Sequence, residues 1–463
     1  MPPALPPALL DALLDPVTLR QVAVAATCNV SCALVGCFLV LRRISLMGDA
    51  LSHAVLPGLV IALLVARDGG PAAMLVGAVG AGLATTFLTR ITQEHGNVAA
   101  DASLGVVYTT LFALGVVLVK RYMTDIHFDI ACVYEGSLLN VAMNTTRIAG
   151  VDVPRAFFTA APVLLAVVTV VTLLWKEWKV ATFDPALAKT MGLAPTAMYY
   201  LLMTMVSVTV MTSFESIGSI LVIAMLIAPG AAAQLLVDRL APMLVVSAVL
   251  AVAATLLGAA AADAMNVSPA GAIAVAAGLL YAAAALFGPR YGVVSRLAGQ
   301  TRLALRVRRE DLLARLYRRR EASPIGAGSP EAAAAGRVTA AEAVAICGGG
   351  WLGRRAVRQL LRRGQARQSG DTILLTDAGA AEGQRLVRSH RLWESYLVDE
   401  VGLQTDHVHD PAHEVEHFLG ESIQAQIEEQ IAPRLDRGRD PHGRDIPAAG
   451  GPRSDGRTGG GGT

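Results

Sequence analysis

Long apolar segments recur along the first 290 residues, and polar residues fall mainly between them. An α-helix of about 20 apolar residues spans the hydrocarbon core of a bilayer. The pattern predicts about nine membrane helices, at residues 18–41, 50–66, 71–89, 103–120, 157–175, 196–213, 217–236, 241–262 and 268–288. Pro57-Gly58 and Pro229-Gly230 are expected to break their helices where the backbone is buried in protein or lines a water-filled cavity.

Charged residues are distributed unevenly between the two halves of the chain. Residues 1–290 hold 29 of the 76 charged side chains, and the last 173 residues hold the other 47. The first half is therefore a candidate for a membrane domain and the second for a soluble one. Basic residues concentrate in cytoplasmic loops. With nine spans the second half is cytoplasmic, on the same side as Arg42, Arg43, Arg90, Lys176, Lys179, Lys189 and Arg239.

The sequence gives little indication of covalent chemistry within the chain. Its five cysteines form no closely spaced framework, and we interpret Cys28, Cys32, Cys37, Cys132 and Cys347 as packing residues. The phosphate-binding motif Gly-x-x-x-x-Gly-Lys-Ser/Thr does not occur. We therefore expect no enzymatic activity, and any ATP hydrolysis must come from a partner.

One acid and one imidazole stand out within the apolar half. Asp49 and His53 are four residues apart, which places both on one face of a helix. Ionisable residues inside a membrane are energetically unfavourable and often line an ion pathway. A carboxylate with an imidazole also suits zinc, manganese or iron(II). A buried ion pair or a capped helix end would explain the pair equally well.

The segment Gly-Asp-Ala-Leu-Ser-His-Ala-Val-Leu-Pro-Gly around this pair resembles the signature of membrane permeases in ABC importers for zinc, manganese and iron. The likeness covers roughly residues 18–290. It implies two permease chains around a path lined by Asp49 and His53, a separate ATP-binding subunit and an extracytoplasmic metal-binding protein. A non-metal importer of similar fold is the alternative.

The same resemblance assigns a role to a short cytoplasmic segment. Residues 182–192 predict a helix that begins at Asp184-Pro185 and ends near a glycine. The alternative interpretation is an ordinary connecting loop, which can contain such a short helix. The resemblance implies that it is the coupling helix that docks into the ATPase subunit, through Phe183, Asp184, Pro185, Lys189 and Gly192.

The second half begins with a basic linker, residues 291–309, and continues with helix, helix, turn, basic helix and hairpin over residues 310–378. That order is typical of a winged helix-turn-helix, whose third helix enters the major groove. Its candidate DNA-binding residues are Arg354, Arg355 and Arg358. A solvated basic helix, or a winged domain kept for protein contacts, is the alternative.

Histidines cluster further along the chain. Five of the nine lie between residues 390 and 417, and His390 with Glu394 has the i, i+4 spacing of one helix face. Imidazoles and carboxylates gathered in this way suit a transition-metal site. A polar surface with chance histidines is the other interpretation. The candidate ligands are His390, Glu394, His409, His413, Glu416 and His417.

Residues 310–448 resemble the diphtheria-toxin-repressor family of metal-dependent regulators. The resemblance implies one metal site of His390, Glu394 and His409, and a second of His413, Glu416, His417 and Asp311. His413 replaces a cysteine or acid of relatives and Asp311 a methionine in some, which favours Mn²⁺ or Fe²⁺ over softer metals, with Zn²⁺ still possible. Residues 379–448 would bind metal and dimerise. The insertion 322–336 departs from the family, and the tail 449–463 is expected to be disordered.

The combined prediction is mainly α: a polytopic permease for divalent metal in the bacterial inner membrane, fused to a winged helix-turn-helix and a helical metal-binding domain. Two hypotheses remain for the second half. Bound metal could gate the permease directly, or the half could repress transcription at promoter DNA, either tethered or released by proteolysis near residues 292–309.

Overall fold

The computed structural model of the protein describes residues 15–66, 71–122, 138–148, 151–322, 337–415, 417–418, 420–431 and 439–447. The chain divides into two compact units, Met1–Arg296 and Leu297–Thr463. We call them the membrane unit and the soluble unit. The predicted insertion, apart from residue 322, and the predicted tail lie outside the described residues.

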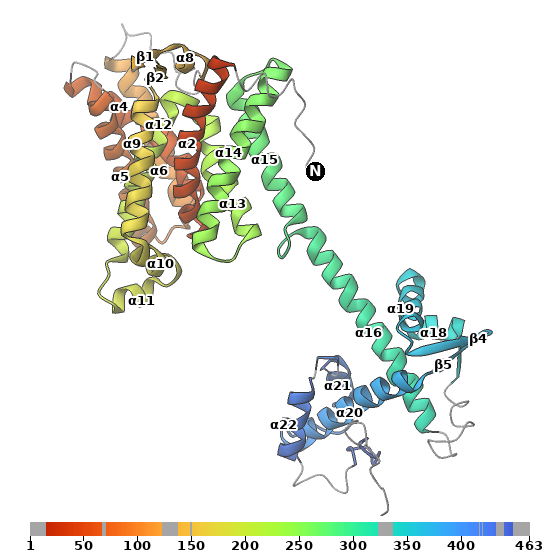
Figure 1. Ribbon diagram of the computed structural model, residues 1–463. Helices are drawn as coiled ribbons and strands as arrows, with labels where there is room; N and C mark the ends of the chain where they lie inside the picture. Colours follow the sequence, from red (N-terminus) through yellow and green to blue (C-terminus); the bar gives the residue numbers. More distant parts are fainter. Residues whose placement is uncertain are drawn as a thin grey trace, which may run out of the picture. The chain divides into compact units, whose positions relative to one another are not determined.

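The membrane unit is a bundle of long helices (Figure 1). They are α2 (Pro16–Leu41), α3 (Leu46–Ala54), α4 (Leu56–Ala66), α5 (Pro71–Gly96), α6 (Ala100–Tyr122), α9 (Phe157–Leu173), α12 (Pro195–Ile217), α13 (Ser219–Leu236), α14 (Leu240–Met265) and α15 (Pro269–Phe287). Shorter elements lie at the two ends of the bundle. Figure 1 shows the helix α8 (Leu138–Met143) and the hairpin β1 (Thr145–Ile148)–β2 (Val151–Pro154) at one end, with α10 (Trp175–Phe183) and α11 (Pro185–Thr190) at the other.

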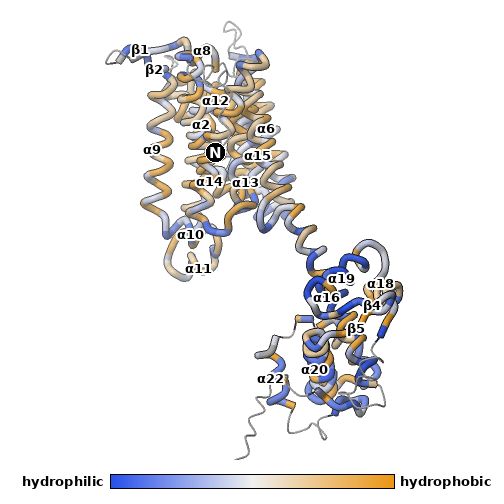
Figure 2. Tube along the Cα trace, turned by 45° about the vertical axis from the view of Figure 1, so that its right-hand side comes forward, coloured by the Kyte–Doolittle hydropathy of each residue, from blue (hydrophilic) through white to orange (hydrophobic). Residues whose placement is uncertain are grey.

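The bundle has the length and the surface of a multi-pass membrane protein. Among the described residues, eight helices are long and apolar enough to cross a bilayer, or nine if α9 and α10, which meet at a bend of 76°, count as one span. Figure 2 shows mostly hydrophobic residues along these helices. Large apolar side chains such as Val117, Leu165 and Leu279 are more than 60% exposed on the isolated chain, as expected for side chains that face lipid.

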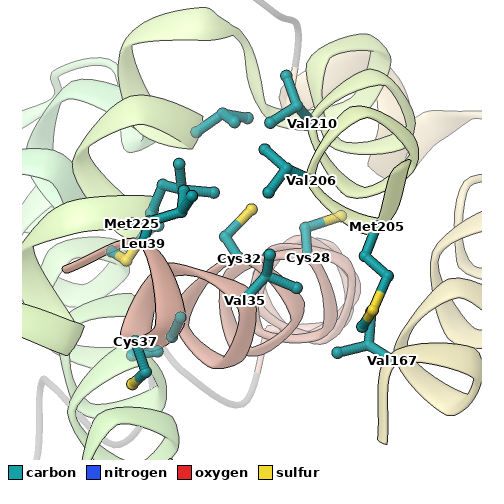
Figure 3. Close-up of a cluster of buried hydrophobic side chains, with 14 of the residues drawn as sticks. Cys28, Cys32, Val35, Cys37, Leu39, Val167, Met205, Val206, Val210 and Met225 are labelled. Carbon is teal, nitrogen blue, oxygen red and sulfur yellow. The ribbon is translucent and has the colours of Figure 1, made fainter. Parts of the chain in front are cut away.

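Helix α2 lies at the centre of the bundle and contacts α9, α12, α13 and α14. Its buried side chains pack against valines and methionines of the neighbouring helices, as Figure 3 shows around Cys28 and Cys32. Cys28, Cys32, Cys37 and Cys347 are buried and free, so the packing interpretation of these four cysteines is confirmed. Cys132 lies outside the described residues.

The two proline-glycine pairs behave differently. Helix α3 ends at Ala54 and α4 begins at Leu56, so the chain is interrupted just before Pro57, as expected. The predicted break at Pro229 is wrong, because α13 continues through that residue to Leu236. Pro229 and Gly230 are buried against neighbouring helices, and such packing stabilises a helix that has lost one backbone hydrogen bond.

A close approach between α2 and α13 gives a testable packing prediction. A Cβ atom on Gly36 would lie 1.8 Å from the backbone oxygen of Leu226, so the helices could not keep their spacing. We expect Gly36→Ala to destabilise the folded protein by about 1–3 kcal/mol, the usual effect of overpacking. Thermal unfolding in detergent measures this effect. The matched control is Gly105→Ala, because nothing lies within 4 Å of a Cβ atom there; equal behaviour of the two variants would contradict the prediction.

The soluble unit begins with a winged helix-turn-helix. Its elements are α16 (Val293–Glu321), β3 (Val338–Thr339), α18 (Ala340–Ile346), α19 (Gly350–Arg362), β4 (Ala366–Ser369) and β5 (Thr372–Leu375). The strands form an antiparallel sheet in the order β3-β5-β4. Leu312, Leu313 and Leu360 are fully buried in the core between these elements. The three helices and the hairpin confirm the predicted fold.

Local sequence signals account for the turns of this domain. The Thr339 hydroxyl accepts a hydrogen bond from the Glu342 amide at 3.1 Å, as in a capping box, in which a Ser or Thr is followed three residues later by Glu or Gln. Gly348, Gly349 and Gly350 all have positive φ, which glycine adopts without a steric penalty. The predicted linker 291–309 is not a separate segment, because its residues from Val293 onward belong to the same helix as Glu310. Leucine, alanine and arginine, all good helix formers, dominate this stretch.

Three further helices complete the soluble unit: α20 (Asp377–Asp399), α21 (His409–Val415) and α22 (Glu421–Ile431). Both α21 and α22 contact α20. The described terminal segment, residues 439–447, is fixed to α20 by Arg388, which hydrogen-bonds the Pro447 carbonyl, and by Arg391, which bonds the Asp445 carbonyl at 2.5 Å. Helix α20 therefore organises this part of the molecule.

Candidate metal centres

The predicted pair in the membrane unit lies on α3, which packs against α6. His53 Nε2 is 3.6 Å from Asp49 Oδ1, and both side chains are partly exposed. The His53 ring is flanked by Tyr108, stacked at 6.0 Å between centroids, and by Phe112, edge-on at 5.9 Å. The carboxylate and the imidazole of α3 thus lie together, and two aromatic rings of α6 flank the imidazole. The pair could hold a divalent cation.

The predicted coupling segment forms a compact turn at one end of the bundle. Asp184 caps α11, because its carboxylate accepts a hydrogen bond from the Leu187 amide at 2.9 Å. Gly192 has φ of +77°, which ends the turn. Pro185 and Lys189 are exposed, and the apolar side chains Phe183, Leu187 and Met191 are 58%, 48% and 61% exposed. An exposed apolar surface of this kind is suited to docking a partner.

In the soluble unit, His390, Glu394 and His409 come together as one cluster. Their ligand atoms all lie within 4.8 Å of one another. The His390 Nε2 and His409 Nδ1 atoms are each 3.0 Å from Glu394 Oε1 and 3.1 Å from each other. His390 and Glu394 are buried on α20, while His409 is exposed at the start of α21. Two imidazoles and a carboxylate around one point suit a transition metal.

His442, which the sequence analysis did not single out, also approaches this first cluster. Its Nε2 atom is 3.9 Å from Glu394 Oε1. A buried carboxylate sets its position, since Asp440 Oδ1 accepts hydrogen bonds from the His442 and Arg444 amides at 3.0 and 2.7 Å. Arg391 lies 3.6 Å from the other oxygen of Asp440. The resulting turn presents a fourth donor to the cluster.

The Glu394 carboxylate gives a pH-dependent prediction for residues 297–463 without metal. Burial alone would raise its pKa, but the hydrogen bond from His390 and the charge of that imidazole lower the pKa from 4.5 to about 2. Ionised Glu394 therefore stabilises the fold above pH 4.5, and this contribution is lost as the pH falls toward 2. We expect Glu394→Gln to remove that part of the acid sensitivity, measured by thermal unfolding across this range. Glu400→Gln is the exposed control; equal acid sensitivity in the wild type and Glu394→Gln would contradict the assignment.

A second cluster joins two distant parts of the sequence. His417 Nε2 is 3.1 Å from Asp311 Oδ1 of α16, and His413 Nε2 is 3.8 Å from the same oxygen. The ligand atoms of the three side chains lie within 4.8 Å of one another. Glu416 lies outside the described residues. Despite the insertion in the sequence between them, the fold brings Asp311 to the predicted histidines.

Glu310 completes the surroundings of the second cluster, and sequence reasoning missed it. Its carboxylate is 3.0 Å from His417 Nδ1, and it is buried. Burial would raise the pKa of Glu310, but hydrogen bonds from His417 and Arg306 outweigh burial and lower it. The ionised carboxylate therefore accepts a hydrogen bond from Nδ1–H. This bond directs Nε2, which lies 3.1 Å from Asp311 Oδ1, toward the cluster, the orientation that metal-binding histidines usually need.

The predicted DNA-binding arginines lie on α19. Arg354, Arg355 and Arg358 are exposed, whereas Ala356, Val357 and Leu360 on the other face are buried in the core. The helix is thus anchored by its apolar face and presents its basic face outward. A recognition helix needs this arrangement to reach phosphates and base edges.

Known proteins are similar to parts of this chain. Residues 376–448 match the metal binding and dimerisation domain of iron dependent repressors. The manganese transport system membrane protein MntD of Bacillus subtilis is 42% identical over 276 residues, 59% of this chain and 93% of that protein. The zinc transport system membrane protein TroD of Treponema pallidum is 37% identical over 371 residues, 80% of this chain and 98% of that protein. The TroD match is longer than the 296 residues of the membrane unit, so it extends into the soluble unit.

The fold of the membrane unit also has a solved counterpart. A chain of the PsaBC structure from Streptococcus pneumoniae, in complex with Fab, is 26% identical, with a TM-score of 0.52 over 61% of this chain and 96% of that chain. Residues 15–288 match the ABC 3 transport family. The protein therefore belongs to the ABC 3 transport family of membrane permeases, with a metal-binding domain of the iron-dependent-repressor type in its C-terminal part.

Proposed function

We propose that the protein is the permease subunit of an importer for a divalent transition metal, and that its soluble unit senses the same class of metal. The observation that carries this proposal is the pair of histidine–carboxylate clusters in a chain whose membrane unit belongs to a transport family. Relatives described as manganese and zinc transport proteins support it. The cargo would pass Asp49 and His53, whose carboxylate and imidazole suit Mn²⁺, Fe²⁺ or Zn²⁺.

Transport in this proposal needs three partners. A separate ATP-binding subunit docks on the exposed side chains around Phe183 and Lys189 and drives the change of access. An extracytoplasmic metal-binding protein delivers the cargo at the opposite end of the bundle, and a second permease chain completes the path. The soluble unit then lies in the cytoplasm, on the same side as the ATPase, where it can sample imported metal.

The two clusters of the soluble unit would each hold one ion. His390, Glu394 and His409, with His442 beside them, form the first centre, and Asp311, His413 and His417, with Glu416, form the second. Bound there, the ion supplies a positive charge that ties α21 to α20 and to α16. Since oxygen and imidazole donors replace thiolate and thioether at these positions, Mn²⁺ or Fe²⁺ should bind in preference to softer ions. Competition between Mn²⁺, Fe²⁺ and Zn²⁺ for binding to residues 297–463 tests this order of preference.

Bound metal could act through this domain in two ways. In the first, bound metal changes how the domain acts on the permease and slows import when the cell is replete. In the second, the domain represses transcription, which the exposed arginines of α19 favour. Winged helix domains that bind DNA in this way rely on phosphate contacts as well as base contacts.

Binding of residues 297–463 to the promoter of the protein's own operon separates these readouts. If the domain is a repressor, Mn²⁺ should induce salt-sensitive binding, and Arg358→Ala should weaken it about tenfold, since contacts to bases are worth about 1–3 kcal/mol each. Arg439→Ala is the control, because that arginine pairs with Asp445 away from α19. Metal binding without DNA binding would leave the gate as the function.

A further inference from the structure

A strongly basic groove lies between α16 and α19 in the soluble unit. It has a volume of about 940 Å³, and arginines make up seven of its eleven lining residues, against two glutamates. Figure 2 shows the hydrophilic stretches of these two helices next to each other. Of these lining residues, only Glu310 contacts a residue of a metal cluster, namely His417. So many like charges in one concave site repel one another, unless an anion neutralises them.

One arginine of the groove is buried and incompletely satisfied. Arg309 is 5% exposed, and its Nε atom has no hydrogen-bond partner among the described residues. Burial and the nearby charge of Arg363 both lower the pKa of its guanidinium. A buried donor of this kind is stabilised when it gains an acceptor. The Nε atom itself is covered, but the Arg309 side chain is part of the groove lining, so an anion bound there would lie close to its positive charge.

We propose that this groove binds a phosphate-bearing ligand, and that Arg309, Arg306 and Arg358 hold its phosphate groups. Guanidinium groups match tetrahedral oxyanions with paired hydrogen bonds, and they keep their charge when partly desolvated. The groove is concave and Arg309 in its lining is almost covered, so a small headgroup or nucleotide reaches it more easily than a DNA duplex does. Of the three candidate DNA-binding arginines, Arg355 and Arg358 also line the groove and Arg354 does not.

The groove is linked to the second metal cluster through Glu310. The Glu310 carboxylate accepts hydrogen bonds from Arg306 at 2.9 Å and from Arg309 at 3.2 Å, while its other oxygen contacts His417. A phosphate that engages the two arginines leaves more negative charge on Glu310. This charge strengthens its bond to His417 and favours metal at Nε2. The link rests on the proposed metal centre, whereas anion binding does not.

The test is a calorimetric titration of the full-length protein in detergent, without metal, using sodium sulfate and inorganic phosphate as probes. We expect saturable binding that Arg309→Gln weakens by at least about tenfold, because a charge-assisted hydrogen bond is lost. Because Arg309 is buried, the exposed pair Arg302→Gln with Arg362→Gln serves as a second variant and should weaken binding similarly. Arg367→Gln is the control, since this exposed arginine lies on β4 outside the groove.

Each outcome decides the proposal. The proposal is overturned if neither anion binds saturably, or if all variants bind the anions equally well. It is also overturned if a DNA duplex binds through Arg302 and Arg362 while neither anion binds. Repeating the titration in phosphatidylglycerol nanodiscs identifies the source of the phosphate: a lipid headgroup already in the groove would suppress the sulfate signal, and a free ligand would not. Mn²⁺ affinity that saturating sulfate leaves unchanged would overturn the link through Glu310, but a failure of anion binding would leave the metal centres intact.

Discussion

Asp49→Ala is expected to abolish uptake of the transported metal in cells that carry the complete importer. The carboxylate and His53 are the partly exposed donor pair on α3, 3.6 Å apart. Loss of a residue that only orients a metal ligand already lowers affinity by about 10–100-fold, so loss of a ligand should lower it further. Uptake of radioactive manganese over time, normalised to the amount of protein in the membrane, measures the effect.

Two controls separate a transport defect from misfolding. Asp49→Asn keeps the volume of the side chain but removes its charge, and it should fail as Asp49→Ala does. Asp101→Ala removes an exposed acid at the start of α6 and should transport normally. Normal uptake by Asp49→Ala would show that the pair with His53 is structural, and the path would then have to be sought elsewhere.

The double variant His413→Ala with His417→Ala should import metal without restraint when the medium is replete. Both imidazoles face Asp311, so their loss removes two of the three donors described at that centre. Metal affinity of the centre should fall by more than about 100-fold, because loss of a residue that only orients a ligand already costs about 10–100-fold. Uptake at high external metal, compared with uptake after starvation, measures the loss of regulation. Promoter activity measured in the same cells tells a transcriptional effect from a direct one.

The control for this experiment is His407→Ala. His407 lies between Glu394 and His409 in sequence, but it is exposed and pairs with Asp406 rather than with a cluster residue. It should leave regulation unchanged. If the double variant also regulates uptake and transcription like the wild type, the second cluster has no sensing role.

Much of the membrane unit could be predicted because bilayer thickness fixes the length of an apolar run. Each predicted span overlaps a helix of the structure. The sequence could not predict that α13 passes through Pro229, because that depends on burial of the residue by neighbouring helices. Nor could it predict the 76° bend between α9 and α10. The predicted span ends at residue 175, where Lys176, Glu177 and Lys179 begin a polar stretch, and this change of polarity does not determine the direction of the next helix.

The metal clusters were predictable to the extent that spacing along one helix determines proximity. His390 and Glu394 are one turn apart on α20 and share a cluster, whereas His409 and His413, one turn apart on α21, belong to different clusters. Glu310 and His442 were missed because tertiary contacts place them. Glu310 reaches His417 across 107 residues, and a turn closed by Asp440 presents His442. An acid immediately before Asp311 was the available signal for Glu310.

The continuity of α16 has a consequence for how the soluble unit could ever be released. Proteases bind their substrates as extended strands, and a peptide bond inside a helix is protected until the helix locally unwinds. Residues 293–321 form one helix, so only Gly292 of the segment proposed for cleavage lies outside a helix. A cut at any later bond of that segment would first require local melting of α16, the helix that also carries Glu310 and Asp311. Metal bound at Asp311 would oppose melting at that end of the segment, so a replete cell would confine cleavage to the region around Gly292.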